Sequence, residues 1–242
     1  MRLEPRGHDV LGIRAANPGP FTLQGTNSWI VGRDPAWLID PGPARAEHLE
    51  SLAQEIDARH GLGGIALTHD HPDHAEAAPE LARRAGGVPV TLPRGGERAG
   101  PFEAIATPGH SADHVSLLLG RVCFSGDTVL GRGSVFIAAD GGGLGPYLNG
   151  LRRLRELDLE ALCPGHGPVV QDPGAKLDEY IEHRLERERK LVAALDQGLR
   201  EPDDLLDAAW DDVDWSLSPY LRWAAGQTLE AHLQKLRAEG RV

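Results

Sequence analysis

The stretch Thr68-His69-Asp70-His71-Pro72-Asp73-His74 carries three imidazoles and two carboxylates within seven residues. It directly follows the apolar run Gly64-Ile65-Ala66-Leu67, a pattern that predicts a buried strand. Imidazole nitrogens and carboxylate oxygens are ligands of zinc and related divalent ions, and grouping them without a cation leaves desolvated polar groups unpaired. The stretch therefore indicates a metal-binding loop at the end of a strand.

The spacing within this loop suits more than one ion. In an extended chain His69 and His71 point the same way, because alternate residues share a face. Pro72 suits the first turn of the helix that Ala75-Glu76-Ala77-Ala78 begins, so Asp73 and His74 are expected at its mouth. One segment could therefore supply ligands to two adjacent metal ions.

Composition indicates a globular protein. The 242 residues, 40% of them apolar, suffice for one large domain, or one domain plus a small appendage. No run of about 18 apolar residues occurs and the N-terminus lacks the apolar core of a secretory signal, so we expect a soluble, cytoplasmic protein with no membrane partner. Cys123 and Cys163 are too few for a disulfide framework. The formal net charge of -11 opposes broad adsorption to nucleic acid or anionic membranes but allows a local basic groove.

The first half of the chain alternates between strand and helix signals. Residues 1–20 show no clear period and are expected to be irregular. Strands are predicted over 26–32, 36–42 and 88–92 and directly before His69, with helices over 44–59 and 75–85. This alternation indicates a layered α/β architecture.

Three later strands each end in a polar turn. Residues 102–107 lead to Pro108-Gly109-His110, residues 122–124 to Ser125-Gly126-Asp127, and residues 159–163 to Pro164-Gly165-His166. A helix marked by leucines at 148, 151, 154 and 157 precedes the third strand. Glycines at such corners let the backbone turn sharply, so that a side chain is presented into a cleft.

The remainder of the chain predicts a helical appendage. Asp172 as N-cap and Pro173 at the first position predict a long amphipathic helix to about Gly198. Further helices are predicted from Glu201-Pro202, from Ser218-Pro219 and over 226–236. The charged run 182–190 is expected to be a solvated helix face, with an RNA-contacting role as the alternative. We therefore divide the chain into domains 1–173 and 174–242.

Together, the stretch 68–74, His110, Asp127 in Ser125-Gly126-Asp127 and His166 in Pro164-Gly165-His166-Gly167 resemble the metallo-β-lactamase superfamily, and within it the LACTB2-like group. Further cues for that group are Gly25-Thr26-Asn27, Gly126-Asp127-Thr128-Val129-Leu130-Gly131, His183-Arg184 with Arg187-Glu188, and His232-Leu233 with Lys235-Leu236. The resemblance implies an α/β fold, a four-layer αβ/βα sandwich with a small C-terminal helical, winged-helix-like domain.

The resemblance also implies a site. His69, His71 and His110 would bind one divalent ion, Asp73, His74 and His166 a second, and Asp127 would bridge them, with Asp73 and Asp127 acting in catalysis. Zinc suits this set, with manganese or iron as alternatives. Two ions about 3.5 to 4 Å apart can share a hydroxide, lower its pKa and stabilise charge developing on a carbonyl or phosphoryl centre. Asp40 is expected to hydrogen-bond a ligand or the ligand loop, and Asp113 and His114 are weaker candidates for that role.

Hydrolysis is thus the expected reaction, and three functions compete. A dinuclear hydrolase acting on an ester-like bond leads, with single-stranded RNA the substrate that LACTB2-like proteins imply. A glyoxalase II-like thioesterase or a lactonase acting on small molecules is the alternative, and a metal-stabilised binding or regulatory module is the second. Only 38 residues, 128–165, separate Asp127 from His166, too few for the inserted domain of β-CASP RNA-processing enzymes. A secreted β-lactamase is disfavoured by Asp at the bridging position and by the lack of a secretory signal. Assembly into a homo-oligomer remains an open alternative.

Some residues are set apart from the site. Cys123 and Cys163 are expected to be buried as small apolar side chains, and the histidines at 8, 48, 60, 183 and 232 to be structural or solvated. Glu76-Ala77 stands where many relatives have two glycines, and Asn149-Gly150-Leu151 follows Tyr147 where the LACTB2-like group commonly has a Ser. We expect Glu76-Ala77 to crowd the helix mouth and to influence the choice of substrate.

Overall fold

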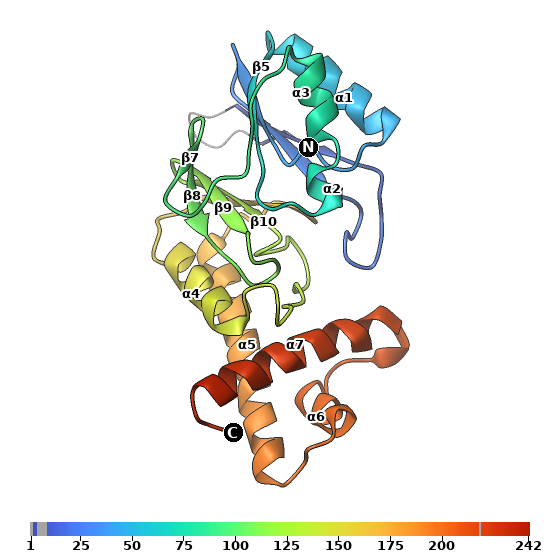
Figure 1. The fold of residues 1–242 in the computed structure, drawn as a ribbon, viewed down its shortest axis with the longest axis vertical. Helices are drawn as coiled ribbons and strands as arrows, with labels where there is room; N and C mark the ends of the chain where they lie inside the picture. Colours follow the sequence, from blue (N-terminus) through green and yellow to red (C-terminus); the bar gives the residue numbers. More distant parts are fainter. Residues whose placement is uncertain (1, 4–8, 218) are drawn as a thin grey trace.

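The structure, a computed structural model, describes residues 2–3, 9–217 and 219–242 and contains two β-sheets that face each other (Figure 1). The first sheet has the order β1-β2-β3-β4-β5-β6 and the second β11-β10-β9-β8-β7. Strands of the first sheet are β1 Arg2–Leu3, β2 Val10–Arg14, β3 Asn27–Val31, β4 Ala36–Ile39, β5 Leu62–Ala66 and β6 Val90–Thr91. Strands of the second are β7 Arg98–Ala99, β8 Phe102–Ala106, β9 Val115–Leu119, β10 Val122–Gly126 and β11 Ala161–Pro164.

Helices join the parallel strands and cover the outer faces. The pairs β4–β5, β5–β6 and β10–β11 are parallel, and the other strand pairs are antiparallel. The connections between the parallel strands carry α1 Ala46–Ala58, then α2 Pro72–Ala75 with α3 Ala78–Arg84, and α4 Leu144–Arg155. Each parallel pair needs such a crossover because a tight hairpin can join only antiparallel strands.

Three apolar clusters confirm the four-layer αβ/βα arrangement. Between the sheets, Trp29 and Ile39 of the first sheet pack with Phe102 and Phe124 of the second. A second cluster joins the first sheet to α1 and α3, through side chains such as Leu38, Leu52 and Leu81. A third joins the second sheet to α4 and the start of α5, through Leu162, Leu151 and Leu177.

The C-terminal region is helical, as predicted. It contains α5 Pro173–Asp196, α6 Pro202–Ala209, the 3-10 helix η1 Trp215–Leu217 and α7 Pro219–Ala238, and α7 crosses α5 in Figure 1. The Asp172 carboxylate accepts a hydrogen bond from the Ala175 amide at 3.0 Å, which confirms the predicted N-cap. The second half of α5 forms its own cluster with α6 and α7. The described residues beyond 196 include no strand, so the winged-helix resemblance and the boundary at 173/174 remain predictions.

Four local predictions need correction. Residues 10–14 form β2, although we expected an irregular segment. The glycine at position 12 interrupts the alternation of side chains that identifies a strand, and a larger residue does not fit because its Cβ would lie 2.7 Å from the Trp29 ring. Strand β9 escaped prediction since its first three residues are buried on both faces and show no alternation. The helix predicted over 75–85 is divided at Glu76-Ala77, where the Ala77 amide bonds the Gly42 carbonyl at 3.0 Å.

The fourth correction concerns the last helices. We expected separate helices from Ser218-Pro219 and over 226–236, but α7 runs unbroken from Pro219 to Ala238; Ser218 itself lies outside the described residues. Gly226 costs helix stability without ending the helix, because apolar side chains before and after it, Ala225 and Leu229, are buried in the same cluster.

Candidate metal centre

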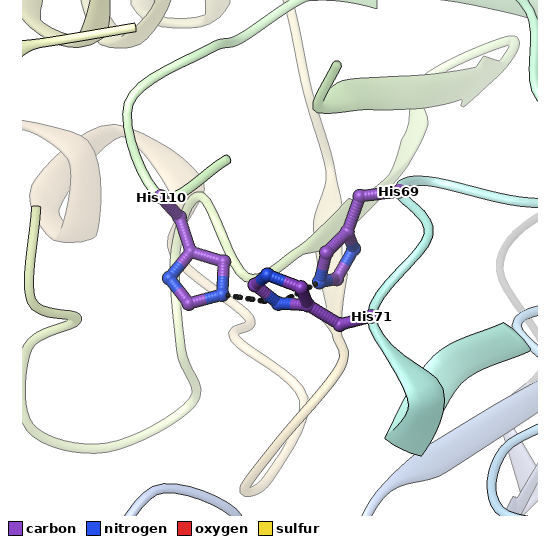
Figure 2. A group of neighbouring side chains, drawn as sticks. All are labelled: His69, His71 and His110. Atoms are coloured by element: carbon purple, nitrogen blue, oxygen red, sulfur yellow. Dashed lines mark hydrogen bonds between the residues drawn. The ribbon is translucent and has the colours of Figure 1, made fainter. Parts of the chain in front are cut away.

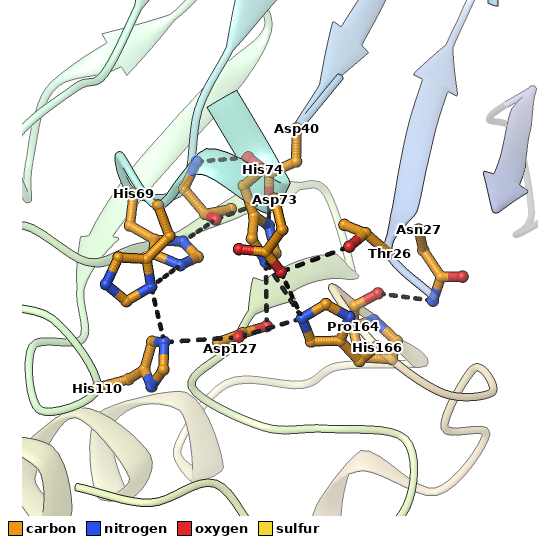
Figure 3. A network of polar contacts seen from close by, with 12 residues as sticks. Thr26, Asn27, Asp40, His69, Asp73, His74, His110, Asp127, Pro164 and His166 are labelled. Atoms are coloured by element: carbon orange, nitrogen blue, oxygen red, sulfur yellow. Dashed lines mark hydrogen bonds and ion pairs between the residues drawn. The ribbon is translucent and has the colours of Figure 1, made fainter. Parts of the chain in front are cut away.

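The seven predicted ligands converge at the carboxyl ends of four strands, between the two sheets (Figures 2 and 3). The loop after β5 and the first turn of α2 carry His69, His71, Asp73 and His74. The other three residues follow β8, β10 and β11, which place His110, Asp127 and His166.

Three histidines form the first group (Figure 2). His71 Nδ1 lies 3.1 Å from His69 Nε2 and 3.0 Å from His110 Nε2. His69 is fully buried and His110 is 8% exposed. A ring nitrogen without a proton is only an acceptor, so three nitrogens pointing at one another suit a shared cation.

The second group contains Asp73, His74 and His166. His166 Nε2 lies 3.3 Å from both His74 Nε2 and Asp73 Oδ2, and His74 Nε2 lies 3.6 Å from Asp73 Oδ2. Ligands placed tetrahedrally about 2.0 to 2.1 Å from zinc would lie about 3.3 to 3.4 Å from one another. The second group therefore has the spacing of atoms that surround one ion.

Asp127 lies between the two groups. Its Oδ2 is 3.5 Å from His110 Nε2 and 3.3 Å from His166 Nε2, and its Oδ1 is 3.4 Å from His74 Nε2. The side chain is buried, and within the described part of the chain Oδ1 has no hydrogen-bond partner. A buried carboxylate oxygen without a donor is costly, and a cation on either side would supply its missing partner. The residues present therefore fit a metal centre.

The pKa values show where the protein itself places positive charge. Burial lowers the pKa of His74, but Asp127 and Asp40 together raise it well above its ordinary value. Burial also lowers the pKa of His166, yet Asp127 and Asp73 raise it to about 9. For His69, burial and the neighbouring histidines lower the pKa well below the ordinary value. Protons on His74 and His166 thus balance the carboxylates, in the position that a metal ion would take.

Asp40 organises the loop that carries the ligands, as predicted. Its Oδ1 accepts from the Thr68 amide at 2.8 Å, and its Oδ2 accepts from the Thr68 hydroxyl at 2.7 Å and pairs with His74 Nδ1 at 3.0 Å. Since the Thr68 hydroxyl donates to Asp40, it accepts from His69 Nδ1 at 3.0 Å. His69 and His74 are therefore both held with Nδ1–H toward these partners and Nε2 toward the other candidate ligands, the orientation that metal binding requires.

His114 fixes Asp127 from behind. The Asp127 amide donates to His114 Nε2 at 3.0 Å, and His114 Nδ1 lies 3.0 Å from the hydroxyls of both Thr107 and Thr128. Burial lowers the pKa of His114 to about 3, which keeps the ring neutral and its Nε2 an acceptor. The supporting role predicted for His114 is confirmed, whereas Asp113 is exposed and makes no hydrogen bond to a ligand among the described residues.

The Gly25-Thr26-Asn27 segment supports the second group, a role that the sequence prediction missed. The Gly25 carbonyl lies 3.3 Å from His166 Nδ1, and the Thr26 hydroxyl lies 3.5 Å from Asp73 Oδ2. Asn27 Nδ2 donates to the Pro164 and Gly167 carbonyls on both sides of His166. The sequence identified the segment only as a family cue. Asn27 and His166 are 139 residues apart, so no local pattern indicates the contact between them.

Other predictions near the site have mixed outcomes. The Glu76 carboxylate accepts from the Ala44 amide at 2.9 Å, so it braces the loop before α1; its influence on substrate choice remains a prediction. Cys123 and Cys163 are buried, as expected. The solvated face predicted over 182–190 is wrong in part, since Arg184, Arg187 and Glu188 are buried between the helices. His8 lies outside the described residues.

A four-layer αβ/βα sandwich with this cluster of histidines and aspartates at the strand ends defines the class of metal-dependent hydrolases. The family model of the metallo-β-lactamase superfamily matches residues 21–94 and 88–166. The chain belongs to the metallo-β-lactamase superfamily.

Its relatives include β-lactamase-like protein 2 and a thioesterase. The chain is 32% identical to the β-lactamase-like protein 2 homolog of Caenorhabditis elegans, over 99% of this chain and 88% of that protein. It is 34% identical to the atrochrysone carboxyl ACP thioesterase of Aspergillus fumigatus, over 85% of this chain and 70% of that protein. The crystal structure of a β-lactamase domain protein from Burkholderia ambifaria has a TM-score of 0.80 and 19% identity, covering 99% of this chain and 88% of that chain. Among the described residues, no helix has the length and apolarity needed to cross a membrane.

Proposed function

We propose that this metal-dependent hydrolase uses two divalent ions and cleaves a small-molecule ester or thioester with an apolar acyl group. The observation that carries the dinuclear part is the position of Asp127, whose carboxylate lies 3.3 to 3.5 Å from histidines of both groups. His69, His71 and His110 would hold one ion, Asp73, His74 and His166 the other, and Asp127 both. Zinc suits the donors, with manganese or iron as alternatives.

The ions supply one part of the chemistry and the chain supplies the rest. Two ions in such a site lower the pKa of a shared water and polarise the substrate oxygen. Asp127 holds the two groups in register, and His114 fixes Asp127 through its backbone amide. Asp73, which is partly exposed, would be the ligand carboxylate nearest to solvent and would accept a proton from a nucleophilic water.

Aromatic side chains beside the first group support an apolar substrate. The Phe136 ring lies 5.4 Å from the His110 ring and 5.4 Å from the Trp223 ring. Phe21 packs edge-on against Phe136, Tyr220 and Trp223, at 5.5, 6.0 and 5.9 Å. Phe21 is 41% exposed, and Tyr220 and Trp223 are each 52% exposed. We call these four residues the aromatic wall.

Exposed aromatic rings of this kind bind flat or apolar groups. The wall draws on three separate segments: the loop after β2, the loop after β10 and the first turns of α7. Domain 174–242, as we divide the chain, would thus contribute to substrate binding while domain 1–173 supplies every metal ligand. The similarity to a thioesterase agrees with an acyl substrate.

Cleavage of single-stranded RNA is the second candidate, since aromatic rings also stack with bases. The formal net charge of -11 works against it, because RNA binding relies on cationic groups along the backbone. The ester or thioester is therefore preferred.

A substrate panel on metal-quantified protein tests the proposal. We expect close to two ions per chain and hydrolysis of aryl or acyl thioesters and esters, with little cleavage of single-stranded RNA. Asp127→Ala should lose activity by more than about a hundredfold while retaining the fold by circular dichroism. The exposed Asp113→Ala is the matched control and should keep full activity. One ion or none per chain, or RNA as the only substrate cleaved, would contradict the proposal.

A further inference from the structure

A cavity separate from the seven ligand residues lies among α5, α6, α7 and the segment Ser134-Val135-Phe136. Its volume is about 140 Å³, which is room for several waters or a group the size of phosphate. Figure 1 shows how α5, α6 and α7 lie relative to one another. Trp210 and Trp215 form part of its walls, and Arg184 and Arg187 lie on the α5 side.

Arg184 is the unusual residue of this cavity. It is 2% exposed, and its Nη2 donates to the Val135 carbonyl. Its guanidinium also lies over the Tyr147 ring, 5.6 Å from the centroid. Its Nε is buried without a hydrogen-bond partner, and no carboxylate of the described residues forms an ion pair with it. A buried charge without a counterion is strongly unfavourable, so the site favours an anion.

The neighbouring charged groups among the described residues supply no counterion for Arg184. Arg187 already pairs with Asp212 and donates to the Ala209 carbonyl, although its Nε also lacks a partner. None of the residues that line the cavity is acidic. His183, which also lines it, has its pKa lowered to about 4 by burial and by the charges of Arg184 and Arg187. Asp212 and Glu179 oppose this effect on His183 but do not cancel it, so the described lining carries positive charge and no acidic side chain.

We propose that this cavity is an anion-binding site for a phosphoryl group, held by the Arg184 guanidinium. A guanidinium presents several N–H groups in one plane and binds phosphoryl oxygens through paired hydrogen bonds. The indole walls Trp210 and Trp215 suit an organic group attached to the phosphoryl. Phe136 belongs both to the cavity lining and to the aromatic wall beside His110, so an occupant would touch the segment that borders the metal centre.

Binding is tested on the metal-loaded protein with inorganic phosphate and tungstate. Crystals soaked in tungstate should show an anomalous peak against Arg184, apart from any peak at the metal centre. In calorimetric titration with phosphate, Arg184→Gln should weaken this binding step about tenfold or more. The control Arg189→Gln, on the same helix but exposed and paired with Glu182 and Glu186, should bind as the natural protein does. Absence of the peak in the natural protein, or unchanged phosphate binding in Arg184→Gln, overturns the proposal.

A kinetic comparison separates the two sources of the phosphoryl group. An S-acyl coenzyme A carries phosphoryl groups, whereas the matching S-acyl N-acetylcysteamine has none. If the group belongs to the substrate, Arg184→Gln should raise KM about tenfold for the first compound only. If free phosphate is the ligand, both compounds should respond equally to the substitution. The binding test measures no enzymatic activity, so its outcome is independent of whether the proposed hydrolysis is correct.

Discussion

Replacing Asp40 with Asn should disable one half of the metal centre and spare the other. Asp40 has φ 47°, a left-handed conformation that Asn adopts more readily than Ala, so Asn is the gentler replacement. If the amide oxygen keeps its bond from the Thr68 amide, the NH2 group takes the place of Oδ2. His74 Nδ1 would then face a donor and could make a hydrogen bond only by accepting.

The expected magnitude follows from this change in the proton on His74. An ion at His74 Nε2 requires the ring to keep its one proton on Nδ1, whereas with Nδ1 as acceptor that proton stays on Nε2, the atom that faces Asp73, Asp127 and His166. To bind at Nε2, the ion must displace that proton and return it to Nδ1, where the N–H group would face the introduced NH2 group, an unfavourable contact between two donors. Loss of such supporting partners lowers metal affinity by about 10- to 100-fold, or about 1.4 to 2.7 kcal/mol. The first group meets Asp40 only through the Thr68 hydroxyl. The two lone pairs of this hydroxyl can accept both from the introduced amide and from His69 Nδ1, so the ion of the first group should be retained.

Graded competition with a chelator, followed by elemental analysis, measures this effect. The natural protein should release its two ions at similar chelator concentrations, whereas Asp40→Asn should fall to one ion per chain at a 10- to 100-fold lower chelator concentration. Asp113→Asn is the matched control, because this exposed carboxylate lies in the same part of the chain as a ligand corner. If Asp40→Asn keeps both ions with unaltered affinity, Asp40 does not set the tautomer of His74 as inferred.

Three further predictions concern pH, stability and substrate. Metal-free protein should lose stability as pH rises from about 6.5 to about 9, because Asp127 and Asp73 overcome the effect of burial and raise the pKa of His166 to about 9 in the folded protein. The positive charge on His166 stabilises the fold fully below the pKa of the unfolded chain, and this contribution is lost as pH rises through the pKa of the folded protein. Denaturant titrations across this range measure the loss, and metal-loaded protein should show no such change. Tyr147→Phe should lower the free energy of unfolding by about 1 kcal/mol, since its hydroxyl donates to the Thr128 carbonyl at 2.8 Å within the core; a urea titration that finds no change would contradict this. Trp223→Ala should raise KM about 2- to 12-fold for an aryl ester and leave an acetyl ester unaffected, because only the larger group reaches the aromatic wall; equal effects on both esters would count against that role.

Local patterns predicted most of the fold because most elements here carry their own signals. Asp172 and Pro173 mark the start of α5, and the corners at His110, Asp127 and His166 end their strands as expected. Where burial covers both faces, as in β9, the alternation that identifies a strand is lost. The break between α2 and α3 depends on a backbone contact to Gly42, which no local pattern reports.

The site shows the same division. The seven candidate ligands could be predicted since each follows a strand end and the set matches a family order, although their metal-binding role still awaits measurement. The contacts from Gly25 and Asn27 to the His166 turn could not be predicted, because they join the start of β3 in the first sheet to the turn after β11 in the second. Burial of Arg184 and Arg187 within a charged helical run was equally hidden, since it depends on how α6 and α7 pack against α5.

Helix α5 connects the sandwich that carries the candidate metal ligands to the C-terminal helices that carry part of the aromatic wall. Its Tyr180 hydroxyl donates to the Gly133 carbonyl and accepts from the Leu130 amide, and its Arg184 donates to the Val135 carbonyl, so it holds the segment that leads to Phe136. The candidate metal ligands all precede α5 in the chain. If the aromatic wall binds substrate as proposed, changes in the last seventy residues would alter substrate selectivity while the candidate metal centre stays unchanged. Exchange of this tail between relatives offers a route, in evolution or in the laboratory, to new selectivity on an unchanged catalytic core.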